Sequence, residues 1–309
     1  WVWDNNGNRS YLSTEVDTFF NFNYNPGIDR QLTLAADDSI YIENKLELTN
    51  GRIQTGHLLV LDTAYLYSTY DDATADLWFV GNVTSNFIIE AAQGNFDKYI
   101  RKDSPADTVF YQPLTGNSLT IGETDRDLTI QEGILSFGLV ETANLDYGDI
   151  FIEAGASIQA SPGITRYQGN WNNIAGGFNH NDGTWIADLG NNRTFTSHQT
   201  DTFNRYIFQT ASNNRVLTIT TGDQFAVEQA LFLNDGRIEG GSVIVFDTLE
   251  VNANYDNGTS EIFFEGSNDG TFISNANRGR HDIFINKNNP SLKVDFIDEN
   301  GGELNVGNA

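Results

Sequence analysis

The sequence predicts an all-β chain that folds as an elongated β-solenoid, similar to a parallel β-helix, with internal repeats. Residues 30–109 align with residues 215–294 without a gap, so the chain repeats itself at an offset of 185 positions. Apolar and polar residues alternate, as in the segment 40–48, and this period of two is typical of strands with one buried face. Similar apolar pairs recur about every 20 residues inside the repeat, which is the length of one solenoid coil.

A string of tandem β-sandwiches is the alternative fold, and it would need about 100 residues per domain with linkers between the domains. The ungapped alignment instead continues through Phe96, the start of the second repeat unit, without a spacer rich in Pro or Gly. The apolar runs are short and are broken by Asn, Asp and Gly, which favour turns, and no segment shows a helical period with caps. These features favour the solenoid.

Short aromatic segments mark the start of each repeat unit. The chain divides into a lead-in coil (1–18), repeat unit 1 (19–95), repeat unit 2 (96–202), repeat unit 3 (203–280) and a truncated repeat unit 4 (281–309). Repeat unit 2 is roughly 30 residues longer than its neighbours, and the extra residues form an insert rich in Asn, Gly and aromatic residues around 167–194. We expect one continuous solenoid.

The composition restricts the classes of partner. The net charge of −25 opposes binding to nucleic acids and to anionic membranes, because both are polyanions. The chain has 39% hydrophobic residues and 21 Phe, which is typical of a folded protein, and it has no Cys. No run approaches the roughly 18 apolar residues of a membrane span, so we expect no membrane insertion. The chain begins at Trp1 and contains no Met, so we expect a segment of a longer polypeptide.

Several short motifs resemble those of a known group of repetitive proteins. These motifs are Gly-Asn-Trp-Asn-Asn at 169–173, Gly-Phe-Asn-His-Asn-Asp-Gly-Thr at 177–184, Phe-Ile-Asn-Lys at 284–287 and Gly-Arg-Ile-Gln-Thr-Gly at 51–56. They resemble the repeats of very large surface proteins of Bacteroidetes, many of which are exported by the type IX secretion system. The resemblance implies an extracellular stalk or adhesin, as in surface attachment or gliding motility, whose partners are the neighbouring domains of the same chain.

The aromatic insert contains a candidate glycan-binding group of residues, Tyr167, Trp171, Phe178 and Trp185. Aromatic faces pack against the apolar side of sugar rings, and nearby Asn and Asp side chains bind hydroxyl groups. The alternative is that these rings pack inside the solenoid, as the corresponding positions do in the family pattern. The expected ligand is a polysaccharide or another cell-surface molecule.

Two acidic turns at equivalent positions of the repeat are candidate Ca²⁺ sites, because their side chains offer hard oxygen ligands. They contain Asp71 and Asp72 in the first copy, and Asp256 and Asn257 in the second. Neither turn matches a known calcium loop, and a solvated turn is the alternative. No other cofactor is expected.

Four residues resemble the acceptor of O-glycosylation in the same bacterial lineage, which modifies Asp-Ser/Thr-aliphatic triplets. They are Ser39, Thr63, Thr108 and Thr248. The alternative is that Asp-Thr simply ends a strand, since both side chains can bond the backbone of a turn.

The leading hypothesis is a non-catalytic structural or adhesive segment of a large exported bacterial surface protein. The alternative is a β-helix carbohydrate-active enzyme, either a polysaccharide lyase or a glycoside hydrolase. A lyase needs cations against a uronate and a base that takes its proton, and the segment 278–281, Arg-Gly-Arg-His, is the one basic cluster. The Gly-x-aliphatic-x-x-Gly segments at 51–56, 133–138 and 236–241 are interpreted as turn glycines and not as nucleotide motifs.

Overall fold

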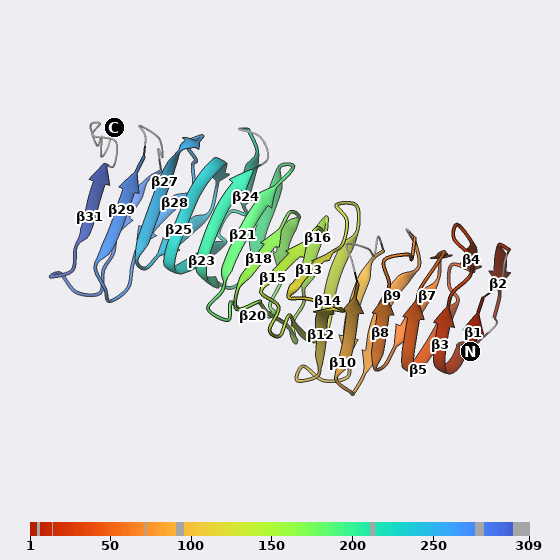
Figure 1. The fold of residues 1–309 in the computed structure, drawn as a ribbon. Helices are drawn as coiled ribbons and strands as arrows, with labels where there is room; N and C mark the ends of the chain where they lie inside the picture. The colour runs from red at the N-terminus through yellow and green to blue at the C-terminus, as the bar shows by residue number, and fades with distance from the viewer. Residues whose placement is uncertain are drawn as a thin grey trace. The chain divides into compact units, whose positions relative to one another are not determined.

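The structure, a computed structural model, describes residues 1–4, 7–13, 15–71, 73–90, 96–210, 214–275 and 281–298. These residues form strands and turns and contain no helix. Consecutive coils lie parallel and side by side (Figure 1), and the described chain makes about 13 turns of a β-solenoid. The predicted fold class is therefore confirmed. None of the described residues forms a helix that could cross a membrane.

The strands are short. In the first half of the chain they are β1 (Val2–Trp3), β2 (Arg9–Tyr11), β3 (Asp17–Tyr24), β4 (Gln31–Leu34), β5 (Ser39–Leu48), β6 (Arg52–Gln54), β7 (His57–Val60), β8 (Thr63–Leu66), β9 (Asp76–Gly81), β10 (Ser85–Ile89), β11 (Lys98–Lys102), β12 (Thr108–Pro113), β13 (Ser118–Ile121), β14 (Asp127–Ser136), β15 (Thr142–Leu145), β16 (Asp149–Ile152) and β17 (Ala156–Gln159). In the second half they are β18 (Ile164–Tyr167), β19 (Asn170–Asn173), β20 (Gly177–Asn179), β21 (Thr184–Leu189), β22 (Arg193–Ser197), β23 (Asp201–Thr210), β24 (Val216–Ile219), β25 (Gln224–Glu239), β26 (Ser242–Val245), β27 (Thr248–Tyr255), β28 (Glu261–Phe264), β29 (Gly270–Ser274), β30 (Ile283–Ile285) and β31 (Val294–Asp298).

By its internal contacts the chain forms two compact units. The N-terminal unit comprises residues 1–162 and 175–177, and the C-terminal unit comprises residues 163–174 and 178–309. Within the C-terminal unit, the insert predicted around 167–194 forms regular strands, because β18 pairs with β21 and β19 pairs with β22. The extra residues therefore build an additional coil rather than a protruding loop.

Long strands bend and pass from one face of the solenoid to the next. The first half of β5 pairs with β7, and its second half pairs with β8. The first face of the N-terminal unit continues through β9 and β11, and the second face continues through β10 and β12. A third face contains β2, β4 and β6. Each coil thus offers outward side chains on separate faces.

The core is made of inward columns of apolar side chains, one residue per coil. One column contains Ile40, Leu58 and Leu77 on successive coils, and all three are buried. Lys98 continues this column between Leu77 and Leu128, and it is fully buried as well. Burying apolar area stabilises by about 25 cal/mol per Å², whereas a buried ammonium group carries a desolvation cost. The position of Lys98 is therefore a local defect in the core.

The two copies of the repeat form equivalent hydrogen bonds. The backbone N–H of Ile53 donates to the hydroxyl of Tyr70 at 3.0 Å, and that of Ile238 donates to Tyr255 at 3.0 Å. Likewise, the N–H of Asp71 donates to a carbonyl of the preceding coil at 2.8 Å, and its counterpart in the second copy does so at 2.7 Å. The alignment of the sequence with itself therefore corresponds to a repeat in three dimensions.

The repeated glycines lie where no side chain fits: Gly51 lies between β5 and β6, and Gly236 lies within β25. Gly51 has φ of 66° and Gly236 has φ of 72°, in the left-handed region that favours glycine. A Cβ atom at either position would lie 2.4 Å from the carbonyl oxygen of Arg30 or 2.6 Å from that of Arg215. The interpretation as a turn glycine is confirmed for Gly51, whereas Gly236 lies within a strand.

Candidate binding surface

The aromatic rings of the insert lie inside the C-terminal unit. Tyr167 and Trp171 are fully buried, and Trp185 is 2% exposed. Phe178 is half-buried, and its ring centroid lies 5.4 Å from that of Trp171 and 4.8 Å from that of Phe203. A buried ring has no face open to a sugar. The structure therefore supports packing for Tyr167, Trp171 and Trp185, and the glycan-binding face predicted from them is wrong.

A buried carboxylate closes one side of this aromatic core. Asp201 Oδ2 accepts a hydrogen bond from Trp171 Nε1 at 2.7 Å, and Oδ1 accepts one from Asn173 Nδ2 at 2.7 Å. Burial raises the pKa of Asp201 to about 6, although these hydrogen bonds act in the opposite direction. The carboxylate satisfies donors that would otherwise be buried without an acceptor, so its role is structural.

The acidic turns predicted to bind Ca²⁺ are half-buried in both copies. Asp71, Asp256 and Asn257 lie just after the equivalent tyrosines, and Asn257 has a positive φ of 59°. Asp72 lies outside the described residues. Among the residues that the structure describes, no group of three or more His, Asp or Glu side chains could hold a metal ion.

The four predicted glycosylation acceptors lie at strand starts and are half-buried. Ser39, Thr63, Thr108 and Thr248 begin β5, β8, β12 and β27. The hydroxyl of Thr63 donates to the carboxylate of the preceding Asp at 2.8 Å, and that of Thr248 does so at 3.0 Å. These bonds are those expected of an Asp-Thr strand end.

Of the basic cluster 278–281, only His281 lies within the described residues. Its Nε2 lies 2.8 Å from the hydroxyl of Tyr255, and its Nδ1 lies 2.8 Å from the carbonyl oxygen and 3.2 Å from the hydroxyl of Ser260. Burial lowers the pKa of His281. Since Ser260 is buried, its hydroxyl is not placed to attack a substrate.

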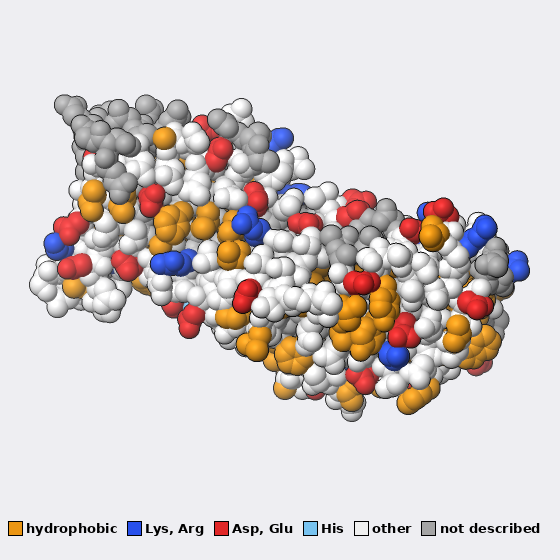
Figure 2. All heavy atoms as spheres, viewed as in Figure 1, with side chains coloured by type: hydrophobic (Ala, Val, Ile, Leu, Met, Phe, Trp, Pro, Cys, Tyr) orange, Lys and Arg blue, Asp and Glu red, His pale blue; other side chains and the backbone are white. Residues whose placement is uncertain are grey.

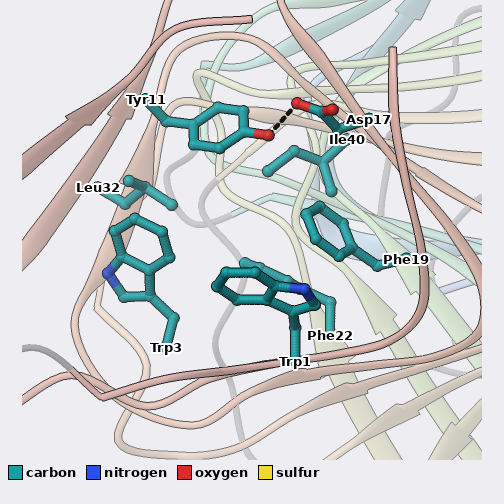
Figure 3. Close-up of a pocket in the computed structure, with 8 residues that line it drawn as sticks. All are labelled: Trp1, Trp3, Tyr11, Asp17, Phe19, Phe22, Leu32 and Ile40. Carbon is teal, nitrogen blue, oxygen red and sulfur yellow. Dashed lines mark hydrogen bonds between the residues drawn. The ribbon is translucent and has the colours of Figure 1, made fainter.

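A pocket of about 280 Å³ opens at the first coil of the N-terminal unit (Figure 3). Its lining residues are Trp1, Trp3, Tyr11, Asp17, Phe19, Phe22, Leu32 and Ile40. Its one carboxylate, Asp17, already accepts a hydrogen bond from Tyr11. The hydroxyl and the carboxylate satisfy each other, and the rest of the lining is apolar. This arrangement offers a hollow in the core and no acid–base pair.

Outward aromatic side chains also form stacked pairs between coils. Trp78 and Tyr99 lie face to face, with centroids 4.1 Å apart and planes at 8°. At the equivalent positions of the second copy, Phe263 and Phe284 lie 4.7 Å apart at 15°. Because stacked rings cover each other's faces, these pairs are ladders that join coils rather than platforms for a ligand.

A ladder of carboxylates runs beside the first of these pairs. Asp76, Asp97, Asp127 and Asp149 stand on successive coils of the first face. The N–H of Asp127 donates to Asp97 Oδ1 at 2.9 Å, and His57 Nδ1 lies 3.1 Å from Asp76 Oδ2. Burial raises the pKa of Asp76 and of Asp127, and the neighbouring carboxylates add to this shift.

The second face carries a different aromatic group, which we call the tyrosine patch: Tyr65, Tyr67 and Ile88. Tyr65 pairs in register with Ile88 on the next coil, and all three side chains are half-buried. The two tyrosine rings are nearly parallel, at 16°, with centroids 6.3 Å apart. Figure 2 shows hydrophobic side chains gathered over β8 and β10, with charged side chains at their border.

Charged groups border the tyrosine patch on both neighbouring coils. Glu47 precedes Tyr65 in register, and its Oε1 lies 3.0 Å from Lys45 Nζ. That ammonium group lies 5.7 Å from the centroid of the Tyr65 ring. On the following coil Glu90 is exposed, and its Oε2 accepts hydrogen bonds from the N–H and the hydroxyl of Ser68 at 3.0 and 3.2 Å.

The tyrosine patch belongs to the first copy only. Glu250 and Asn252 occupy the positions of Tyr65 and Tyr67 in the second copy, although the surrounding backbone hydrogen bonds are repeated. Reasoning from the sequence missed these residues. The signal was present, since both tyrosines hold outward positions of a predicted strand and differ from their counterparts.

Comparison of the chain with protein families, with curated proteins and with solved structures finds no match.

Proposed function

We propose that the chain is a non-catalytic structural and adhesive segment of a large exported bacterial surface protein that contacts glycans. The tyrosine patch carries the proposal: two half-buried, nearly parallel rings stand beside the exposed carboxylate of Glu90, which can bind a hydroxyl group. The second copy keeps the scaffold and lacks these rings.

The stacked coils supply the structural part of the function. Inward columns such as Ile40, Leu58 and Leu77 tie each coil to the next, and backbone hydrogen bonds run between coils. A load along such a stack is shared by many parallel bonds. Weak contacts on repeated coils add up through effective concentration.

The location and the modification of the chain are part of the same proposal. We place it at the bacterial cell surface, beside other domains of its polypeptide, as the resemblance of its motifs implies. O-glycosylation at Thr63 and Thr248 would add hydrophilic bulk on an outward face. The intact mass of protein purified from its native host tests this, since the mass of the bare polypeptide would exclude the modification.

Retention on insoluble polysaccharides tests the adhesive function. The purified chain is mixed with a panel of neutral, acidic and basic polysaccharides, and the bound fraction is measured. The double variant Tyr65→Ala/Tyr67→Ala should lose retention. Tyr41→Ala, which removes a half-buried tyrosine of the first face, is the matched control and should bind like the parent chain. Retention by no polysaccharide, or equal retention by both variants, would refute the glycan contact.

A second candidate function is favoured by the carboxylate ladder. A glycoside hydrolase needs two carboxyl groups near the scissile bond, one protonated and one ionised, and the raised pKa values of Asp76 and Asp127 suit an acid. Incubation with each polysaccharide and assay for new reducing ends or unsaturated ends separates the two candidates. Turnover that Asp97→Asn/Asp127→Asn abolishes would establish the enzyme and replace our first proposal.

A further inference from the structure

We propose that the tyrosine patch recognises a polymer of unsubstituted amino sugars, whose ammonium groups bind Glu90, because both oxygens of Glu47 are already held by Lys45 and Asn23. This inference rests on the proposed glycan contact and specifies its chemistry. Three observations carry it: an internal ammonium group already held at the patch, an exposed carboxylate on the opposite side, and the spacing of the coils.

Lys45 shows which group the patch accommodates. Its Nζ lies between the carboxylate of Glu47, at 3.0 Å, and the ring of Tyr65, at 5.7 Å from the centroid. An ammonium group close to both a carboxylate and an aromatic face gains from ion pairing and from the ring quadrupole. The hydrogen bond to Glu47 raises the pKa of Lys45, which keeps this group charged. The surroundings of Tyr65 are therefore suited to a cation.

Glu90 offers a second, open position of the same kind. Its Oε2 is held by Ser68, while its Oε1 accepts no hydrogen bond from the described residues. The N–H of Glu90 donates to the carbonyl of Leu66 at 2.9 Å, so Glu90 stands beside Tyr67 on the next coil. An exposed carboxylate oxygen beside a half-buried aromatic ring is complementary to an ammonium group from outside.

The spacing of the coils fits an extended sugar polymer. Glu47, Tyr65 and Ile88 follow one another on three successive coils in register. Neighbouring strands lie about 4.8 Å apart, which is close to the length of one pyranose unit. A chain laid along the stacking direction would therefore meet the ring of Tyr65 and the side chain of Ile88 with successive sugars, and Glu90 follows β10 on the same coil as Ile88.

Long-range electrostatics favour the same ligand. The net charge of −25 attracts a polycation and repels polymers of uronic acids or sulfated sugars. N-acetylated amino sugars share the ring and hydroxyl chemistry but lack the charge, so they provide the critical comparison.

Calorimetric titration with oligomers of glucosamine and of N-acetylglucosamine, at mildly acidic pH, tests the inference. The glucosamine oligomer should bind more tightly, and its binding should weaken as salt is added. Glu90→Gln should weaken it by about tenfold, the loss expected of one charge-assisted contact. Glu141→Gln, which neutralises an exposed carboxylate remote from the patch in sequence, should not.

The outcomes separate this inference from the proposal on which it rests. Equal binding of the two oligomers, or no effect of Glu90→Gln while Tyr65→Ala/Tyr67→Ala abolishes binding, would overturn the amino-sugar specificity and leave the glycan contact standing. Binding of neither oligomer together with retention on another polysaccharide would do the same. Binding to no polysaccharide at all would overturn both. Circular dichroism of each variant distinguishes lost binding from lost folding.

Discussion

Lys102 and Lys287 occupy equivalent positions in the two copies of the repeat, and each directs its ammonium group at backbone carbonyls of earlier coils. Lys102 Nζ donates to the carbonyl of Val80 at 2.6 Å and to the hydroxyl of Ser85 at 2.9 Å. The hydroxyl of Ser85 in turn donates to the carbonyl of Leu61 at 2.6 Å.

In the second copy Gly270 takes the place of the serine. Lys287 Nζ donates directly to the backbone carbonyl of Phe246 at 2.9 Å and to the backbone carbonyl of Glu265 at 2.6 Å. Lys287 thus makes directly the contact that Lys102 makes through the hydroxyl of Ser85, and it joins its own coil to the two preceding coils.

Lys102→Met should lower the free energy of unfolding by about 1–3 kcal/mol, because the carbonyl of Val80 loses its buried ammonium donor. Lys287→Met should cost less, since Lys287 is more exposed and water can replace it. Urea denaturation of both variants measures the difference. An unchanged stability of Lys102→Met would show that desolvation of the ammonium group cancels its hydrogen bonds.

Lys98→Ile should stabilise the fold and flatten its pH dependence. The equivalent residue of the second copy is Ile283, whereas burial lowers the pKa of Lys98 to about 7 from 10.5. Between these values the unfolded chain binds a proton that the folded chain does not, so stability rises with pH from about 7 toward 10.

Denaturation at neutral and at mildly alkaline pH measures this change. The parent chain should gain stability at alkaline pH and Lys98→Ile should not, while Lys45→Ile, at a partly exposed lysine, should behave like the parent chain. A variant that remained as dependent on pH as the parent would contradict the buried charge.

Asp201→Asn should destabilise the aromatic core of the C-terminal unit. Both carboxylate oxygens accept from buried donors, Trp171 Nε1 and Asn173 Nδ2, and an amide would turn an NH₂ group toward one of them. An unsatisfied buried donor costs about 1–3 kcal/mol. Thermal denaturation followed by Trp fluorescence reports it, and Asp182→Asn, whose side chain is 94% exposed, serves as control. Equal melting temperatures of the two variants would contradict this role.

His281→Phe should remove an acid sensitivity of the second copy. Phe96 holds the equivalent position in the first. Burial lowers the pKa of His281 from 6.5, so as the pH falls below about 6.5 the unfolded chain takes up a proton first and stability declines. Comparison of the unfolding free energies of parent and variant at neutral and acidic pH tests this. Carboxylates also titrate in this range, so the informative quantity is the difference between the two pH profiles. Identical profiles of the parent chain and of His281→Phe would contradict the prediction.

The fold was predictable because the features that determine it, strand alternation and turn residues, can be read from short stretches of sequence. Period-two alternation fixes which residues of a strand face the core, and the ungapped repeat implies that coils, rather than independent domains, are copied. Glycines such as Gly51 could be assigned to turns for the same reason.

The sequence marks the tyrosines as outward residues that differ from their counterparts, but it does not show which residues meet them, because that depends on the register between coils. Trp78 and Tyr65 are both outward aromatic residues, yet Trp78 stacks on Tyr99 of the next coil, while Tyr65 meets Ile88. The lengths of the intervening turns decide these neighbours. The aromatic insert was misjudged similarly, because its composition suits a sugar site while its alternation directs Trp171 inward.

The additional coil that starts at β18 shows how a chain of this kind can change in length. A strand shifted by one residue would turn its apolar set toward solvent. The loss or gain of a whole coil leaves every remaining strand with an edge of the same kind to pair with, and the inward columns merely become shorter or longer. The insertion or deletion of one coil, about 20 residues of sequence, is therefore the smallest change in length that keeps every strand in register. Each such change moves outward residues such as Tyr65 along the stack by one strand spacing.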